Sequence, residues 1–145
     1  MKKIILATFA ASLFASAGAF SAPKEVQIKN GYNGIDVVGT DINLARQFTI
    51  KAITGRSGFI KNNFDATLSA NVIAGLTDDA TNNRMGVVSG SNKGYTVFTG
   101  SSVGGSVSQC GPQVDKTVAD LSASLVKEGT LALANANGCG ITTTP

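Results

Sequence analysis

The sequence predicts an α+β protein that is mostly antiparallel β, with about six or seven strands and one C-terminal amphipathic helix clamped by a disulfide. Three observations lead to this class. Apolar and polar residues alternate with a period of two along much of the chain, as strands require. Glycine is abundant, with 17 residues that often stand beside Asn or Ser, which is typical of tight turns. An α-helical stripe appears only near the end. An all-β sandwich or barrel with a helical decoration is the alternative.

The first strands are expected before residue 60. Alternation at 26–28 and again at 35–37 flanks two Asn-Gly pairs, and this arrangement predicts a β-hairpin. Residues 41–47 are ambiguous and allow a helical turn capped by Asp41. A further strand is expected over 48–52 and ends at the Gly-Arg-Ser-Gly sequence of 55–58.

The clearest strand is expected over 64–72, where apolar residues occupy every even position and polar residues every odd position. A polar loop follows at 77–83. Strands are then expected at 85–88 and 95–99, whereas 100–109 reads as either a weak edge strand or a flexible loop. One more short strand is expected around 131–133.

The predicted helix lies between the two cysteines. Val114, Val118, Leu121 and Leu125 fall on one stripe of an α-helix, with Pro112 before it and Gly129 after it. Cys110 and Cys139 are the only cysteines, and their spacing is far from a C-x-x-C motif. In an exported chain such a pair predicts a structural disulfide, which would clamp the helix onto the sheet.

The N-terminus predicts a secretory signal peptide over 1–19. Lys2 and Lys3 precede the apolar run 4–14, and a segment of small residues follows. Ala17 and Ala19 fit an A-x-A cleavage site, so one β-rich extracytoplasmic domain is expected over 20–145. The alternative is an uncleaved membrane anchor. No second apolar run is long enough to span a membrane.

Composition argues against several classes of function. Removing the two leader lysines from the formal net charge of +3 leaves about +1, which provides no general attraction to nucleic acid. The chain has no histidine, so His-dependent nucleophilic catalysis and His-ligated metal sites are absent. We therefore expect a protein that is not an enzyme, with no catalytic residues, cofactor or metal.

Three local patterns allow other interpretations. The loop Asp78–Asn83 contains carboxylate and amide oxygens suitable for calcium, but it lacks the EF-hand spacing. The glycine-rich segment 100–106 resembles a phosphate cradle without the Gly-Lys-Ser/Thr ending. Tyr32 and Tyr95 have the chemistry to stack on a ligand. We expect the Asp78–Asn83 segment to be a surface turn and the 100–106 segment to be a loop. We expect Tyr32 and Tyr95 to be packing residues.

The sequence favours a non-catalytic exported protein that acts through its surface, as an adhesive, fimbrial-like or secreted assembly component. The expected location is the periplasm, the cell surface or the extracellular medium, and the expected partner is a protein or cell surface, with self-association allowed. Unpaired strand edges at 26–28 or 100–109 would accept another chain. The alternative is a monomeric binding module, either an inhibitor or a small-ligand carrier.

Overall fold

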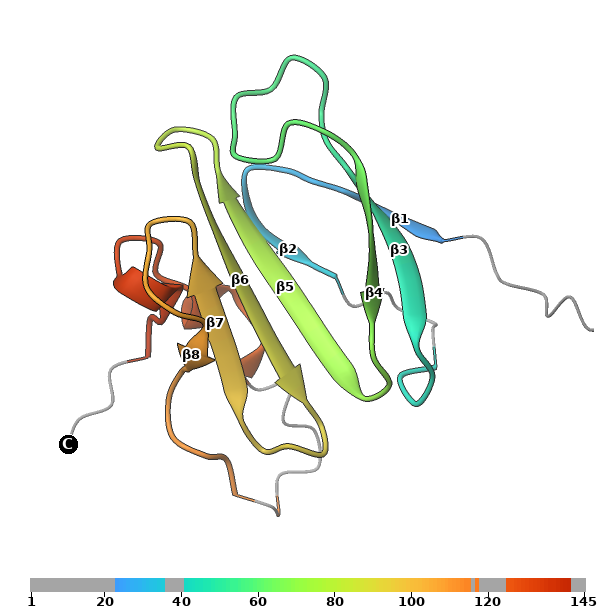
Figure 1. The fold of residues 1–145 in the computed structure, drawn as a ribbon, viewed down its shortest axis with the longest axis vertical. Helices are drawn as coiled ribbons and strands as arrows, with labels where there is room; N and C mark the ends of the chain where they lie inside the picture. The colour runs from blue at the N-terminus through green and yellow to red at the C-terminus, as the bar shows by residue number, and fades with distance from the viewer. Residues whose placement is uncertain (1–22, 36–40, 116, 118–124, 142–145) are drawn as a thin grey trace, which may run out of the picture.

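The protein is mostly β, and its described residues form eight strands in two sheets (Figure 1). The computed structural model describes residues 23–35, 41–115, 117 and 125–141. The strands are β1 (Lys24–Gln27), β2 (Gly31–Gly34), β3 (Arg46–Lys51), β4 (Phe64–Leu68), β5 (Val72–Asp79), β6 (Arg84–Ser91), β7 (Val97–Ser101) and β8 (Ser108–Gln109). Two 3-10 turns follow, η1 (Glu128–Thr130) and η2 (Ala136–Gly138).

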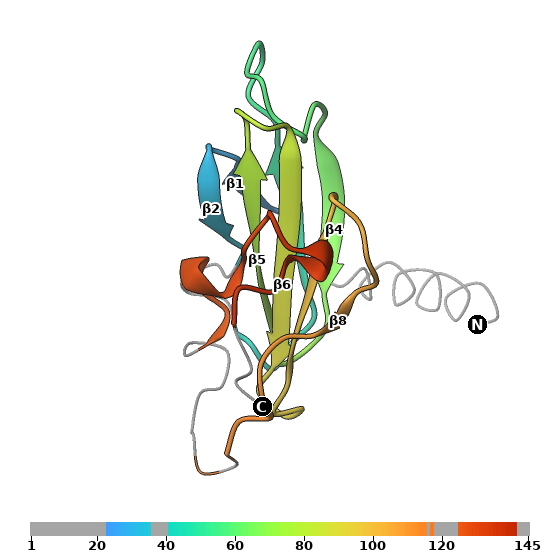
Figure 2. The same cartoon turned by 90° about the vertical axis from the view of Figure 1, so that its left-hand side faces the viewer.

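The two sheets pack face to face. A three-stranded sheet has the order β1-β3-β4, and a five-stranded sheet has the order β2-β5-β6-β7-β8. All neighbouring strands are antiparallel except β1 and β3, which are parallel. Figure 2 shows β1 and β2 on one side of the molecule and β4 and β8 on the other.

The predicted class is correct in its dominance of β structure, and the described residues form eight strands where about six or seven were expected. The described ranges contain no α-helix of seven or more residues. Most of the helix predicted over 114–125 lies outside the described residues, at 116 and 118–124. The predicted signal peptide, with Ala17 and Ala19, also lies outside them.

The predicted hairpin over 26–37 is wrong, since β1 and β2 belong to different sheets. The Ile28 amide still donates to the Lys51 carbonyl at 3.0 Å, which continues the pairing of β1 with β3. The next residue, Lys29, satisfies both of its backbone groups with the side-chain amide of Asn33, at 2.9 Å each. Gly31 then takes a φ of +90°. The Asn-Gly chemistry therefore makes a corner between sheets rather than a hairpin turn.

The strand predicted over 64–72 is also divided. β4 ends at Leu68, and the Val72 amide donates to the Ser69 carbonyl at 3.2 Å across a turn in which Asn71 has a φ of +61°. β5 starts at Val72 in the other sheet. The alternation of apolar and polar residues continues through this turn at Ser69, Ala70 and Asn71, so the sequence pattern does not mark the break. Asparagine tolerates the left-handed conformation that the turn requires.

Two apolar clusters stabilise the fold. The first lies between the sheets and contains Ile28, Ile35, Phe48, Ile50, Ile60, Ala74 and Leu76. The second lies on the opposite face of the five-stranded sheet and contains Ile73, Val88, Val97 and Val126. Because Val126 belongs to the C-terminal segment, residues 125–141 act as a cover for that second face.

The predicted disulfide is present. Cys110 and Cys139 are bonded across 29 residues, and Cys110 is fully buried. The strand predicted around 131–133 is reduced to a single bridge between Leu131 and Cys139. Gly86 of β6 leaves room for Leu133, whose methyl group occupies the space that a Cβ would need. The disulfide and this close packing together hold the C-terminal segment on the sheet.

Candidate binding groove

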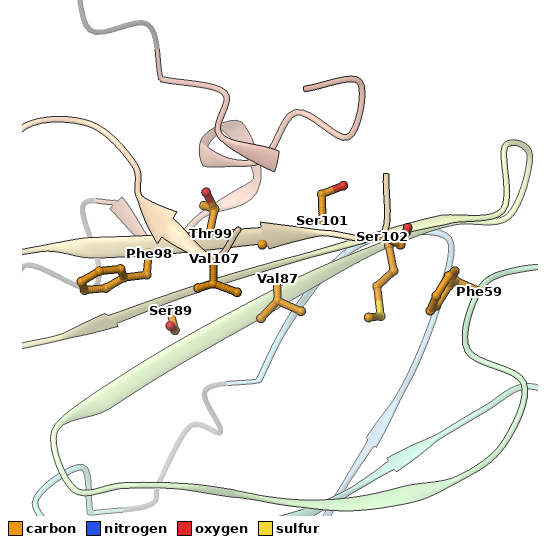
Figure 3. Close-up of a pocket in the computed structure, with 10 residues that line it drawn as sticks. Phe59, Val87, Ser89, Phe98, Thr99, Ser101, Ser102 and Val107 are labelled. Carbon is orange, nitrogen blue, oxygen red and sulfur yellow. The ribbon is translucent and has the colours of Figure 1, made fainter. Parts of the chain in front are cut away.

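A largely apolar groove of about 330 Å³ opens on the face of the five-stranded sheet that points toward the three-stranded sheet. Its floor comes from β6 and β7, with Val87 and Phe98 as the largest exposed apolar side chains (Figure 3). Phe59 stands at one end and Val107 lies across β7. We call this feature the β6–β7 groove. Its remaining lining residues are Met85, Ser89, Thr99, Gly100, Ser101 and Ser102.

The groove exists because the three-stranded sheet covers only part of the opposite face. In the sheet register, Leu76 of β5 pairs with Val87 of β6, so both side chains point to the same side. Leu76 is 3% exposed in the core between the sheets, whereas Val87 is 36% exposed. The neighbouring set of paired residues, Ala74 of β5, Ser89 of β6 and Phe98 of β7, shows the same change across the sheet, because Ala74 is buried and Phe98 is exposed. The face of the sheet that forms core at β5 is therefore exposed to solvent at β6 and β7, where its side chains are still apolar.

Phe59 is positioned by a buried carboxylate. Asp78 at the end of β5 is fully buried, and its Oδ1 accepts a hydrogen bond from the Phe59 amide at 2.8 Å. Its Oδ2 forms an ion pair with the Arg56 guanidinium at 2.8 Å and accepts a longer bond from the Ile60 amide. Arg56 also donates to the Asp78 carbonyl at 3.2 Å. One side chain thus organises the loop that presents Phe59 to the groove.

Val107 reaches the groove because β7 has a glycine beneath it. A Cβ added to Gly100 would lie 2.9 Å from the Val107 Cγ2 atom. Val107 itself is 74% exposed, so its side chain covers the sheet on one side and faces solvent on the other. Close approach to a strand is a common role for a glycine within a sheet.

The groove is electrically neutral, since no charged residue is among those that line it. Hydroxyl groups of Ser89 and Ser102 provide polar positions beside the apolar floor. The Ser102 hydroxyl accepts a hydrogen bond from the Met85 amide at 2.8 Å, which joins the loop after β7 to β6. An uncharged apolar floor with a few hydroxyls suits an uncharged apolar partner.

The predicted Asp78–Asn83 loop is not a single loop in the structure. Asp78 belongs to β5 and is used by Arg56 and the 53–63 segment, so its interpretation as a surface turn residue is wrong. Asp79 accepts hydrogen bonds from the amides of Thr81 and Asn82 and from the Asn82 side chain. These bonds lower the pKa of the Asp79 carboxyl below its ordinary value. Within the described ranges, no group of three or more potential metal ligands occurs.

The other candidates from the sequence are structural. Residues 100–101 end β7, and 102–107 form the loop that carries Val107 and leads into β8 rather than into the N-terminus of a helix. The Tyr32 hydroxyl donates to the Val126 carbonyl at 3.1 Å, and burial raises its pKa. Tyr32 packs against the second apolar cluster, which agrees with the packing role expected for it. None of the helices that the structure describes is long and apolar enough to cross a membrane.

The groove residues were not singled out from the sequence, although a signal was present. Val87-Val88 and Val97-Phe98 are adjacent apolar pairs, and adjacent residues of a strand point to opposite faces. Such pairs indicate that both faces of β6 and β7 are apolar. One face is covered by the C-terminal segment, and the other is left as the groove.

The geometry defines a small disulfide-bonded β protein with an exposed neutral apolar groove. Searches against protein-family models, curated proteins and solved structures find no significant match for the chain.

Proposed function

We propose that this is a non-catalytic exported protein that binds another protein through the β6–β7 groove, as an adhesive, fimbrial-like or secreted assembly component. The observation that carries the proposal is the exposure of Val87 and Phe98 on a face that is otherwise core. Exposed apolar surface of this kind, with a polar rim, is typical of sites that bind protein partners.

Export is supported by two independent features. The sequence of residues 1–19 has the charged, apolar and small-residue regions of a signal peptide. The Cys110–Cys139 disulfide is consistent with an oxidising compartment such as the periplasm or the extracellular space. Protein from the source cells should begin at Phe20 when its N-terminus is sequenced. Recovery of the chain from cytosol with intact Met1 and two free thiols would contradict export.

Binding through the groove is tested by site-specific photocrosslinking in intact source cells. A photoreactive phenylalanine is placed at Val87, and a matched control places it at Leu44, which is apolar and 62% exposed but lies outside the groove. We expect a discrete protein adduct from position 87 and none from position 44. Equal adduct patterns at both positions, or none at position 87, would rule out the groove as the binding surface.

The volume of the groove also allows a second function. Pockets for small molecules begin at about 300 Å³, and the β6–β7 groove measures about 330 Å³. A periplasmic or secreted carrier of a small apolar ligand is therefore the alternative. Native mass spectrometry of protein purified from the source cells separates the two functions. A bound small molecule that is lost in Val87→Glu supports the carrier.

A further inference from the structure

The strand β4 has an edge without a strand partner within the described ranges, because it ends the three-stranded sheet. Its five residues alternate in direction. Phe64, Ala66 and Leu68 share the core-facing side with Phe48 and Ile50 of β3, to which Ala66 and Phe64 are paired. The backbone groups that point away from β3 are therefore available to pair with an added strand.

β4 packs on the same core cluster as one wall of the β6–β7 groove, although no β4 residue lines the groove itself. Met85, which lines the groove, packs against the same core cluster as Ala66 and Leu68 of β4. Phe64 points to the core-facing side yet is 45% exposed, so the space between the sheets is not sealed on this side. Figure 2 places β4 and β8 at this side of the molecule, whereas β1 and β2 are on the opposite side.

The sequence indicated two other edges for strand addition, at 26–28 and 100–109. β1 and β8 do lie at sheet edges. However, β1 lies on the side away from the groove, and β8 has only two residues for pairing. Among the edge strands that the structure describes, β4 alone has five residues for pairing and lies on the same side of the molecule as β8, opposite β1 and β2.

We infer that the groove receives one extended segment of a different protein chain, which pairs with β4 and packs alternate side chains on Val87 and Phe98. This inference rests on the proposed binding function and specifies its mode. Strand addition supplies affinity through main-chain hydrogen bonds and selectivity through the alternate side chains that enter pockets. The added strand extends the three-stranded sheet over the uncovered part of the five-stranded sheet.

The charges around β4 define the chemistry of the partner. Because the groove lining is uncharged, the inward side chains of the partner are apolar. Asp65 is the only charged residue of β4, and it points outward, where its Oδ1 accepts a hydrogen bond from the Thr49 hydroxyl at 2.7 Å. A cross-strand Lys or Arg beside Asp65 is attracted, and an acidic residue there is repelled. The partner segment is thus apolar at alternate positions and basic at an outward position.

This chemistry disfavours a second copy of the chain as the occupant. The edge strands β1, β2 and β8 each lack two apolar residues at alternate positions. β4 of a second copy has the apolar alternation but carries Asp65 instead of a cation. The outward charge therefore points to a different polypeptide.

The experiment uses the disulfide-bonded protein of residues 20–145 and three labelled peptides. The first is Val-Thr-Val-Lys-Val-Thr-Val, the second has Glu in place of Lys, and the third has the composition of the first with its valines in one block. Affinities come from fluorescence anisotropy, and amide hydrogen exchange locates the bound peptide. We expect the Lys peptide to bind about two- to five-fold tighter than the Glu peptide and to protect β4 amides. The block peptide should bind at least about ten-fold more weakly, because it loses the alternate apolar contacts.

Variants of Asp65 test the charge argument. Asp65→Lys should reverse the preference between the Lys and Glu peptides, and Asp65→Asn should abolish it while keeping a side chain of the same shape. Asp65→Asn decides the matter if Asp65→Lys does not fold. Unchanged preference in the asparagine variant overturns the partner chemistry. Protection of β1 or β8 instead of β4, or no binding of the alternating peptide, overturns strand addition.

Two further outcomes identify other occupants and overturn the inference. Concentration-dependent dimerisation that protects β4 without peptide would assign the edge to a second copy. Protection of β4 in the peptide-free monomer that disappears when the chain starts at Pro23 would assign it to residues 20–22. Failure of strand addition is distinguishable from failure of the proposed function, because the photocrosslink at position 87 depends only on the groove.

Discussion

Asp78 and Arg56 form an ion pair whose Oδ2 and Nη1 atoms are 2.8 Å apart, with the Asp78 side chain fully buried and that of Arg56 13% exposed. The pair joins the end of β5 to the 53–63 segment, which has no regular secondary structure apart from turns. Ile60 of this segment enters the core between the sheets, and Phe59 enters the groove. The same carboxylate therefore supports both the core and the candidate site.

Removal of the Asp78 carboxylate should destabilise the protein and loosen the groove wall. Asp78→Ala leaves the Arg56 charge without its partner, and breaking a buried pair in this way costs about 3–5 kcal/mol of unfolding free energy. We expect the lower end of this range because Arg56 keeps some exposure. Urea unfolding measures the loss, and hydrogen exchange should show faster exchange of the Phe59 and Ile60 amides. Asp65→Ala, at an exposed carboxylate, is the control and should change stability little.

The disulfide should contribute about 3–4 kcal/mol, since it closes a loop of about 30 residues in the unfolded chain. Unfolding in denaturant with and without a reductant measures this contribution. The double variant Cys110→Ala, Cys139→Ala should match the reduced protein and show no response to reductant. A reduced protein as stable as the oxidised one would show that the C-terminal segment is held by packing alone.

Gly75 and Gly34 lie opposite each other in the pairing of β2 with β5, but only one should tolerate alanine. A Cβ at Gly75 would overlap the ring and hydroxyl of Tyr32, which is held by its bond to the Val126 carbonyl. Gly75→Ala should therefore destabilise the protein by about 1–3 kcal/mol, as overpacked cores do. The nearest atom to a Cβ at Gly34 is 3.9 Å away, an ordinary contact.

Thermal or urea unfolding of the two glycine variants checks this difference. Gly34→Ala should be close to wild type. If the overlap with Tyr32 causes the destabilisation, a double-mutant cycle should show it. In the Tyr32→Ala background, Gly75→Ala should lower the unfolding free energy much less than it does in the wild-type background. Equal destabilisation by both alanines would instead indicate a general effect on the β2–β5 pairing.

The Asp79 turn should make stability depend on pH below about 4. Hydrogen bonds from Asn82 lower the pKa of Asp79 in the folded protein, so the unfolded chain binds its proton at a higher pH. The stabilisation is therefore present above the unfolded pKa and is lost as pH falls through the folded pKa. Carboxyl NMR titration should give a midpoint below the ordinary value of 3.8. Asp79→Asn should flatten the acid-side decrease of stability, and an unchanged profile would contradict this assignment.

Several elements were predictable because their information is local. The strand β3 follows from alternation over a short run, β6 and β7 follow from short runs of strand-forming residues between polar loops, and the disulfide follows from two cysteines in a chain with a predicted export signal. The segment 41–47 was ambiguous in the sequence, but the turn-forming role that it allowed for Asp41 is present, since Asp41 Oδ1 accepts a hydrogen bond from the Asn43 amide at 2.9 Å. For the strands and the turn, side-chain chemistry within a few residues is sufficient, whereas the disulfide follows from there being two cysteines to pair.

The errors have a common physical cause. A residue pattern predicts an extended backbone or a turn, but it contains no information about which sheet a strand joins. The Asn33 side chain satisfies Lys29 and allows β1 and β2 to separate, and Asn71 turns the chain inside an uninterrupted alternation. Similarly, Asp78 resembles a surface residue until Arg56, distant in sequence, is placed beside it.

The amino-acid sequence alone determined the dominance of β structure, the covalent link between Cys110 and Cys139 and the absence of histidine. The export signal of residues 1–19 stays a prediction. Tertiary structure alone decided that β4 ends its sheet without a further strand partner among the described residues and that Val87 and Phe98 are exposed. The physical reason is that burial is a property of two surfaces in contact. Whether an apolar face of β6 and β7 becomes core or binding site depends on how far the other sheet extends over it.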